Sequence, residues 1–269
     1  FALFKTCLLM FRSDILVLGD GVLAPIGAVI RILFPRKKVV TILHGLDITY
    51  SLPFYQRFWV HGFLRLLDGY FCVSTHTETQ AIRHGVNARK CFVIPNGVET
   101  ERFISKRDRD RLETILGRSL EGKIVLLTLG RLAKRKGVAW FIQHVLPRLN
   151  GNILYVVAGS GPEELAIRET AVKANLDARV ILLGRVSQDD VLTLLNSSDI
   201  FVQPNIHVSG DMEGFGIAVI EAGSAGLPVV ASDLEGLRDA VRQGENGFLV
   251  KPEQADGFIR TINELAENN

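Results

Sequence analysis

The sequence predicts an α/β fold built from two parallel-sheet domains. Short apolar runs rich in β-branched residues alternate with helical patterns along the whole chain, which is typical of parallel sheets covered by helices. A polar, charged stretch between Glu99 and Gly122 separates an earlier set of runs from a later one. A length of 269 residues suits two domains of ordinary size. We therefore expect domains over residues 1–98 and 122–269, joined by a linker over residues 99–121.

Each expected element follows from a local pattern. The expected strands are short runs of apolar residues: Ile15–Leu18, Val39–Leu43, Tyr70–Val73, Cys91–Ile94, Ile124–Leu129, Ile153–Ala158, Val180–Leu183, Ile200–Gln203 and Pro228–Ser232. Helical patterns between them include Gly137–Leu149, Pro162–Ala174, Gln188–Asn196 and Gln254–Ala266, with a short helix over Arg107–Leu116 in the linker.

Composition excludes several classes of protein. With 47% hydrophobic and 22% charged residues the chain has enough apolar surface for a core, unlike a disordered chain. A net charge of +2 argues against a dedicated nucleic-acid binder. The cysteines are Cys7, Cys72 and Cys91, and their odd number without CxxC spacing indicates reduced structural thiols in a cytosolic protein. Arg12 and Asp14 interrupt the apolar start, so no run is long enough to cross a membrane.

The stretch from Glu213 to Glu221 is the strongest indication of a ligand site. Gly214 and Gly216 let the backbone approach a ligand closely, and the apolar run 217–222 predicts a helix whose first N–H groups suit a phosphate. Eight helical residues span about 12 Å, so the two carboxylates would hold opposite ends of an extended ligand such as a nucleotide sugar. The alternative is a helix capped by one glutamate and solvated at the other.

A basic turn follows the expected strand 124–129. Arg131 and Lys136 are placed to reach one anion, and a guanidinium with an ammonium group neutralises a diphosphate. The alternative is a solvated basic turn. Glycines also follow other strand ends, where open α/β sheets bind ligands, but none completes the G-x-G-x-x-G pattern of dinucleotide sites.

In combination these motifs resemble the large family of retaining glycosyltransferases of GT-B fold, of the group 1 or family 4 type. The resemblance rests on Gly130-Arg131-Leu132 with Lys136-Gly137, Gly159-Ser160-Gly161-Pro162, Gly184-Arg185-Val186, Glu213 to Glu221, Gly226 to Ala231 and Asn246 to Val250. In the first half it rests on Thr41 to Asp47, which contains His44-Gly45, and on Ile94 to Val98.

The resemblance implies two Rossmann-like domains facing each other across a cleft, the first of them incomplete, and it implies roles by position. Arg131 and Lys136 resemble the diphosphate clamp, Glu221 the carboxylate that accepts the ribose hydroxyls, and Glu213 the group that holds the transferred sugar. His44 would face the reactive carbon of the sugar, although a histidine that caps the turn before Gly45 is the alternative. The donor-binding residues implied in this way are Gly130, Gly184, Arg185, Val186, Gly214, Phe215, Gly216, Ile217 and Glu221, with Gly184 to Val186 along the base.

The implied reaction is front-face sugar transfer with retention. The basic pair would stabilise charge on the leaving phosphate, which would itself take the acceptor's proton. No cofactor and no metal are expected, because the UDP- or GDP-linked donor is a co-substrate. Asp108-Arg109-Asp110 imitates a metal-binding DxD sequence but stands in the charged linker, and it is interpreted as a solvated helix turn.

The implied partners are a nucleotide-sugar donor and a glycan or lipid-linked acceptor of cell-envelope polysaccharide or glycolipid synthesis, without nucleic acid. The segment 52–67 mixes aromatic and basic residues and suits either peripheral contact with the inner membrane face or burial against the first sheet. The resemblance begins after the family's first strand, so we expect a fragment with weak turnover. A non-catalytic nucleotide-sugar binding module and a nucleotide-sugar epimerase of the same fold are the rival functions.

Overall fold

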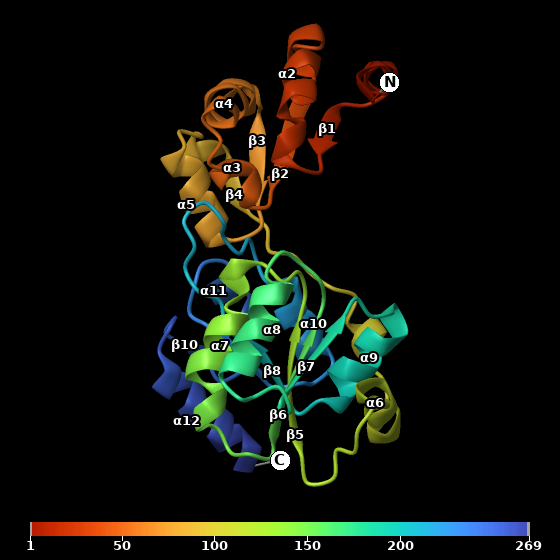
Figure 1. Cartoon of the computed structure of the whole chain (residues 1–269). Helices are drawn as coiled ribbons and strands as arrows, with labels where there is room; N and C mark the ends of the chain where they lie inside the picture. Colours follow the sequence, from red (N-terminus) through yellow and green to blue (C-terminus); the bar gives the residue numbers. More distant parts are fainter. Residues whose placement is uncertain (1, 268–269) are drawn as a thin grey trace. The chain divides into compact units, whose positions relative to one another are not determined.

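The computed structural model describes residues 2–267, and the chain divides into two compact units (Figure 1). Unit 1 comprises Phe1–Asn96 and Ser209–Phe215, and unit 2 comprises Gly97–Val208 and Gly216–Asn269. Each unit carries a parallel sheet with helices packed on it. The predicted fold class, two parallel-sheet α/β domains, is confirmed.

Unit 1 contains a four-stranded sheet. Its strands lie in the order β1 (Ile15–Leu18), β2 (Lys38–Leu43), β3 (Gly69–Cys72) and β4 (Cys91–Val93), and all neighbours are parallel. The α-helices are α1 (Ala2–Met10), α2 (Ala24–Leu33), α3 (Leu46–Thr49), α4 (Pro53–Tyr55) and α5 (Thr75–Arg83). Shorter turns are η1 (Gly21–Leu23), η3 (Leu64–Leu66) and η4 (Ala88–Lys90), and η2 (Gln56–Phe63) is a π-helix.

Alternation of side chains explains the position of this sheet's core. Along β2 the residues Val39, Thr41 and Leu43 are buried, whereas the residues between them are only partly covered. Cys72 and Cys91 are buried free thiols, and burial raises the pKa of both. They therefore stay protonated and act as small apolar groups in the core.

Unit 2 contains a six-stranded sheet. Its strands lie in the order β10 (Phe248–Val250), β9 (Val229–Ser232), β8 (Ile200–Gln203), β5 (Ile124–Leu129), β6 (Ile153–Ala158) and β7 (Val180–Gly184). The α-helices are α6 (Arg109–Leu116), α7 (Val138–His144), α8 (Glu164–Lys173), α9 (Gln188–Ser197), α10 (Ile217–Ser224), α11 (Leu237–Ala240) and α12 (Ala255–Glu267). The short turns are η5 (Thr100–Phe103), η6 (Lys134–Lys136) and η7 (Leu146–Arg148).

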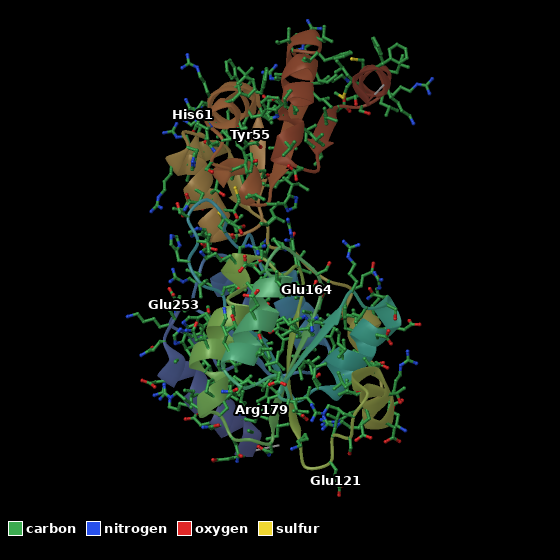
Figure 2. All side chains as sticks on the ribbon, viewed as in Figure 1. Tyr55, His61, Glu121, Glu164, Arg179 and Glu253 are labelled. Carbon is green, nitrogen blue, oxygen red and sulfur yellow. The ribbon has the colours of Figure 1, made fainter. Side chains whose placement is uncertain are left out.

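The core of unit 2 forms around β6, which is buried along its whole length. The ring of Tyr155 lies 4.8 Å from that of Phe141, which in turn contacts Phe258 of α12 at 6.1 Å. The buried Tyr155 hydroxyl is 2.8 Å from the Thr128 hydroxyl, so its polar atom is satisfied. Arg179 (Figure 2) donates to the carbonyls of Ile153 and Asn150 and ties the start of β7 to the start of β6.

The strand order of unit 2 reverses at β5. From this strand the chain first adds β6 and β7 on one side and later β8, β9 and β10 on the other. In open α/β sheets such a reversal leaves a crevice beyond the carboxyl ends of the strands, and ligands bind there. The topology thus indicates a ligand site at the loops after β5, β6 and β7.

Every expected strand is present, with ends that differ by no more than one residue, and β10 is an additional strand. The expected helix in the linker is α6, and residues 97–121 belong to unit 2. They do so because Asp108 and Arg109 bond to residues at the end of α9, including Ser197. The segment Ser209–Phe215 groups with unit 1, although the sequence places it inside the second domain.

Candidate functional site

The loops after β5, β6 and β7 are joined by backbone hydrogen bonds. Gly130 N–H donates to the Ala158 carbonyl at 3.0 Å, and Gly159 N–H donates to the Gly184 carbonyl at 2.7 Å. Gly159 has a φ of 139°, and a Cβ there would overlap the carbonyl oxygen of Gly130. Only glycine fits this close approach, so the three strand ends form one continuous backbone floor.

A cavity of about 350 Å³ lies over this floor. Its walls are mostly apolar, but Arg185, Gln188 and Glu221 bring polar groups to it. The full lining is Leu129, Gly130, Ala158, Gly159, Arg185, Val186, Gln188, Val191, Ala218 and Glu221. A narrow apolar cavity with a few polar groups is the usual form of a site for a small ligand.

A second cavity of about 560 Å³ adjoins the first, because both are lined by Gly130, Gly159 and Arg185. Arg131 and the segment Ser160 to Pro162 complete its lining. The two cavities together form a continuous hollow across the strand ends, which we call the strand-end site. It suits a ligand longer than a single ring.

Charges of opposite sign line the two cavities of this site. Burial raises the pKa of Glu221 in the first cavity, while Arg102 of η5 acts in the opposite direction. Arg131 in the second cavity is exposed, and within residues 2–267 no carboxylate lies at ion-pair distance from it. The site therefore offers a carboxylate for hydroxyl groups at one end and an available guanidinium for an anion at the other.

Gly184 and Gly216, two of the predicted donor-binding glycines, have backbone roles here. Gly184 ends β7 with a φ of 66°, and Gly216 precedes α10 with a φ of 92°, which is favourable only for glycine. Gly216 lets the following helix begin at Ile217, so that Ala218 and Glu221 line the first cavity. The residues that the structure brings together at the strand-end site are Gly130, Arg131, Gly184, Arg185, Val186 and Glu221.

Lys136 lies outside the lining of the strand-end site. It ends η6 and is 7% exposed, and it lines neither of the two cavities. Gly137 follows it with a φ of 65°, and a Cβ there would overlap the carbonyl oxygen of Pro204. The paired action of Lys136 and Arg131 on one diphosphate therefore stays a prediction.

His44 lies in unit 1, in a turn that Asp47 holds. The Asp47 carboxylate accepts from the N–H groups of Gly21 and His44 at 3.1 Å and of Gly45 at 2.7 Å. Burial raises the pKa of Asp47, and the bond from His44 counteracts this. Asp47, and not the imidazole, thus caps the turn, while His44 Nε2 lies 3.0 Å from the Gly19 carbonyl oxygen.

Sequence reasoning gave Asp47 no role, although the carboxylate stands three residues after His44, at the spacing of a local side-chain cap. Its importance follows from the third donor, Gly21, which is 26 residues away. The sequence pattern alone does not show that contact.

Glu213, Gly214 and Phe215 also belong to unit 1. Glu213 is 7% exposed and Phe215 is 5% exposed. A Cβ at Gly214 would overlap the carbonyl oxygen of His44, so glycine allows this segment to lie directly against the His44 turn. The structure therefore groups His44 with Glu213, Gly214 and Phe215, and it groups the remaining predicted residues in unit 2.

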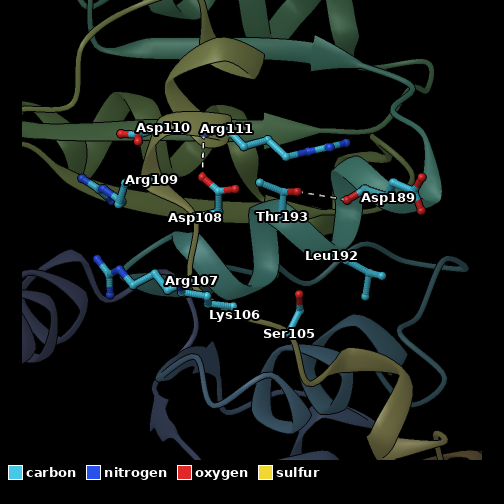
Figure 3. Close-up of a pocket in the computed structure, with 10 residues that line it drawn as sticks. All are labelled: Ser105, Lys106, Arg107, Asp108, Arg109, Asp110, Arg111, Asp189, Leu192 and Thr193. Atoms are coloured by element: carbon cyan, nitrogen blue, oxygen red, sulfur yellow. Dashed lines mark hydrogen bonds between the residues drawn. The ribbon is translucent and has the colours of Figure 1, made fainter.

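The Asp108–Asp110 sequence lies beside a third cavity of about 590 Å³, the α6 cavity, between residues 105–111 and α9 (Figure 3). Asp108 accepts from the N–H of Arg111 at 2.9 Å and caps α6. Over the part of the chain that the structure describes, no group of three or more His, Cys, Asp or Glu side chains could hold a metal ion. Asp108 is thus the N-cap of α6, and the expectation of a site without metal stays a prediction.

Comparisons with known proteins give the family of this chain. A family model described as "Glycosyl transferases group 1" matches residues 115–269, more than half of the chain. The chain belongs to this family. A second model, "Glycosyltransferase Family 4", matches residues 5–102. The resemblance read from the sequence motifs is confirmed.

Curated relatives extend beyond this chain. The amylovoran biosynthesis glycosyltransferase AmsK of Erwinia amylovora is 27% identical over 266 residues, which cover 96% of this chain and 62% of AmsK. An Escherichia coli protein named as a UDP-Gal:alpha-D-GlcNAc-diphosphoundecaprenol alpha-1,3-galactosyltransferase is 30% identical over 189 residues, covering 68% of this chain and 47% of that protein. The group 1 chain described here spans less than two thirds of the length of these relatives.

Among solved structures, the Anabaena protein Alr3699/HepE in complex with UDP has a TM-score of 0.84 and 23% identity. The match covers 99% of this chain and 72% of the Anabaena chain. The same protein in complex with UDP-glucose gives a TM-score of 0.82 at 24% identity, again over 99% of this chain and 72% of that one. These likenesses establish the GT-B fold for this group 1 family member.

Proposed function

We propose that this protein is a glycosyltransferase that moves a sugar from a nucleotide diphosphate donor to an acceptor hydroxyl with retention of configuration. The observation that carries the proposal is the strand-end site, in which Glu221 and Arg131 line adjoining cavities over one backbone floor. A nucleoside diphosphate has the matching order of groups, with a base, ribose hydroxyls and an anion.

Each part of the donor has a candidate partner. Glu221 accepts hydrogen bonds from the ribose hydroxyls, and Gly184 to Val186 lie along the base. Arg131 takes the diphosphate, and Lys136 adds its charge. Glu213, with the backbone of Phe215 to Ile217, holds the transferred sugar. His44 is the residue proposed to meet the reactive carbon of the sugar.

In this mechanism the bond between the sugar carbon and the phosphate oxygen breaks first, towards an oxocarbenium-like state. Charge then grows on the leaving diphosphate, where Arg131 and Lys136 stabilise it. The leaving phosphate takes the proton of the acceptor hydroxyl, which attacks the same face of the sugar. Two carboxylates flanking one bond, as glycosidases use, are therefore not required.

Calorimetry with a nucleoside diphosphate and its sugar ester tests this assignment. Glu221→Ala should weaken binding of the bare diphosphate by about 1.5–3 kcal/mol, since a charged hydrogen-bond partner of the ribose is lost. Glu213→Ala should leave that affinity unchanged and lower the preference for the attached sugar. Equal losses for both variants on the bare diphosphate would remove the division of roles.

Donor binding should be independent of divalent metal, because Arg131 and Lys136 replace the cation. Affinity should be the same with EDTA as without it, whereas Lys136→Ala should lower it. A strict requirement for magnesium or manganese would count against the proposal and return attention to Asp108 and Asp110.

Turnover separates the enzyme from its rivals. Release of nucleoside diphosphate with transfer of sugar, and an unchanged anomeric configuration by NMR, would be the signature of a retaining transferase. Donor binding without turnover would favour a non-catalytic nucleotide-sugar binding module. A changed sugar still attached to the nucleotide would indicate an epimerase.

For the acceptor we propose a glycan or lipid-linked saccharide of the cell envelope, reached at the inner membrane face from the cytoplasm. The name of the Escherichia coli relative describes transfer to a GlcNAc-diphosphoundecaprenol, which is a lipid-linked saccharide. None of the helices in the described part of the chain is long and apolar enough to span a bilayer.

Unit 1 carries a surface suited to contact with that membrane face. Leu52, Phe54 and Phe58 are 51%, 58% and 46% exposed, and the two phenylalanine rings lie 4.6 Å apart. Arg57 and Arg65 are exposed nearby, and no acidic residue stands between Asp47 and Asp68. Aromatic side chains beside arginines favour the interface of an anionic bilayer.

Burial and the neighbouring Arg65 lower the pKa of His61 (Figure 2), so the arginines provide the charge of this surface at neutral pH. Sedimentation with vesicles containing phosphatidylglycerol should deplete the protein from solution, and Phe54→Ser with Phe58→Ser should abolish this effect. Binding that is equal for neutral and anionic vesicles would contradict the role of Arg57 and Arg65.

A further inference from the structure

We propose that the side chain of Arg185, fixed by Ser160, contacts the nucleobase of the donor and selects bases that present a carbonyl oxygen. The inference rests on the proposed function and deepens it. The resemblance assigns the base to backbone groups of Gly184 to Val186, whereas the structure offers a charged side chain at the same place.

Arg185 lies where the two cavities of the strand-end site meet. Arg185 follows the left-handed Gly184 at the end of β7, and it is the charged residue that lines both cavities of the strand-end site. Glu221 lines only the first cavity and Arg131 only the second. Arg185 therefore stands at the junction, next to the part of the ligand held in the first cavity.

The guanidinium of Arg185 is held in place. Arg185 Nε donates to Ser160 Oγ at 2.9 Å. Ser160 is fixed in turn, because its carbonyl accepts from the N–H of Leu132 at 3.1 Å. Within residues 2–267 no carboxylate pairs with Arg185, so the N–H groups on its two terminal nitrogens are available to a ligand. A planar group fixed at one nitrogen loses little further entropy on binding.

The lining of the first cavity indicates which part of the ligand Arg185 meets. The first cavity has apolar walls from Leu129, Val186, Val191 and Ala218, which suit the faces of a base, and it has the Glu221 carboxylate for a ribose. A base seated there extends along the wall that Arg185 provides. Arg131, which lines only the second cavity, is then the residue for the phosphates.

The chemistry of the guanidinium gives the selectivity for the nucleobase. A guanidinium has only donors, so it pairs with base edges that carry acceptors. Uracil and guanine present carbonyl oxygens, whereas the exocyclic amino group of adenine is a donor at the corresponding edge. UDP or GDP should therefore bind more tightly than ADP, and this preference should depend on Arg185.

The experiment compares the wild type with Arg185→Ala, Arg185→Lys, Ser160→Ala and Arg131→Ala. Calorimetry gives the affinity for UDP, GDP and ADP, and ligand-observed NMR titrations give that for uridine and pyrophosphate. Arg185→Ala should weaken UDP and uridine by about 10-fold, leave pyrophosphate unchanged and remove most of the preference over ADP. Arg131→Ala should weaken UDP and pyrophosphate and leave uridine unchanged.

The remaining variants test the geometry. Arg185→Lys keeps the charge but loses the planar group, so it should behave more like Arg185→Ala than like the wild type. Ser160→Ala should give a smaller loss for UDP, of about threefold, because the guanidinium is no longer held. Thermal melting of each variant verifies that it is folded.

Several outcomes would overturn the inference. An equal loss of pyrophosphate and UDP in Arg185→Ala would make Arg185 a phosphate ligand. Unchanged affinities would leave the base to the backbone, and a wild type that prefers ADP would refute the selectivity. Failure of the wild type to bind any of the nucleotides would instead overturn the proposed function, and the inference with it.

Discussion

Two regions of unit 2 are lined by arginines, and they differ in what the arginines pair with. Arg107, Arg109 and Arg111 line the α6 cavity (Figure 3). Arg107 and Arg109 both bond to the carboxylate of Asp199, at 2.6 and 3.0 Å, and Arg111 bonds to Asp190 at 3.3 Å. In the strand-end site, neither Arg131 nor Arg185 forms an ion pair with a carboxylate of residues 2–267. The arginines of the α6 cavity are thus already neutralised by carboxylates.

The difference separates a structural use of arginine from a binding use. Asp199 is 7% exposed and also accepts from the N–H of Val125, so its arginines compensate a buried charge next to β8. A guanidinium without a carboxylate partner beside a glycine floor has no such structural task. The pairing of charges therefore points to the strand-end site as the region suited to bind a ligand.

Gly159→Ala should have the largest effect, because the strand-end site takes its shape from backbone contacts. The new Cβ would overlap the Gly130 carbonyl oxygen at a φ of 139°. We expect a loss of about 3 kcal/mol or more in the free energy of unfolding, together with loss of UDP binding. Chemical denaturation and calorimetry measure the two quantities.

The matched control is Gly223→Ala in α10, where nothing lies within 4 Å of the added Cβ. Alanine is preferred to glycine inside a helix, so this variant should be unchanged or slightly more stable and should bind UDP normally. A Gly159→Ala protein with normal stability would show that the three strand ends are not rigidly joined.

Arg109→Ala should lower stability without changing ligand affinity. The guanidinium bonds to Asp199 and to the carbonyl oxygens of Ser197, Leu120 and Lys123, so its removal takes a donor from each and leaves the buried charge of Asp199 less compensated. We expect a loss of about 3 kcal/mol in denaturant unfolding. A clear change in UDP affinity at temperatures where the variant is folded would contradict the structural role of this cavity.

Arg131→Ala should show the opposite behaviour. Its side chain is exposed and has no ion pair within the described residues, so stability should change by no more than about 0.5 kcal/mol. Affinity for UDP should fall by about 10-fold or more, since a charge-assisted contact with phosphate is lost. If melting temperature and affinity fell together, the distinction between the two groups of arginines would fail.

The fold and the site were predictable from the sequence to different degrees. Strand runs such as Ile153–Ala158 are buried on both faces, so local composition predicts them almost residue by residue. The short strand β10 was missed, because Phe248–Val250 has only three residues and its assignment depends on pairing with β9. The eight-residue π-helix η2 likewise has no simple periodicity in the sequence.

Within the site, motif resemblance identified Arg131 and Glu221, which do line the adjoining cavities. It could not reveal the bond from Arg185 to Ser160, since the two residues are 25 positions apart on different loops. Motif resemblance also could not reveal that Glu213 groups with the His44 turn in unit 1. Such contacts depend on how strand ends and loops meet in space, and no local pattern records that.

Glu221→Gln should have the smallest effect, and it tests the acidic group of the strand-end site. Burial raises the pKa of Glu221, so folding favours its protonated form. A raised folded-state pKa means that stability is full below the unfolded-state pKa and is lost as pH rises through the folded-state pKa. At neutral pH the unliganded wild type should therefore be less stable than Glu221→Gln.

The gain in the glutamine variant should be less than about 1 kcal/mol, because the carboxylate keeps part of its contact with water. It should disappear below about pH 4, where the wild-type carboxyl is protonated in both states. UDP affinity should change in the other sense, being lower in Glu221→Gln at neutral pH, since a neutral amide accepts ribose hydroxyls less strongly than a carboxylate. Thermal melts from pH 4 to pH 8, with and without UDP, measure both changes. A carboxylate that lowers stability in the unliganded protein but raises it when UDP is bound is a binding group. Asp199 is compensated by two arginines, so Asp199→Asn should instead lower stability both with and without UDP.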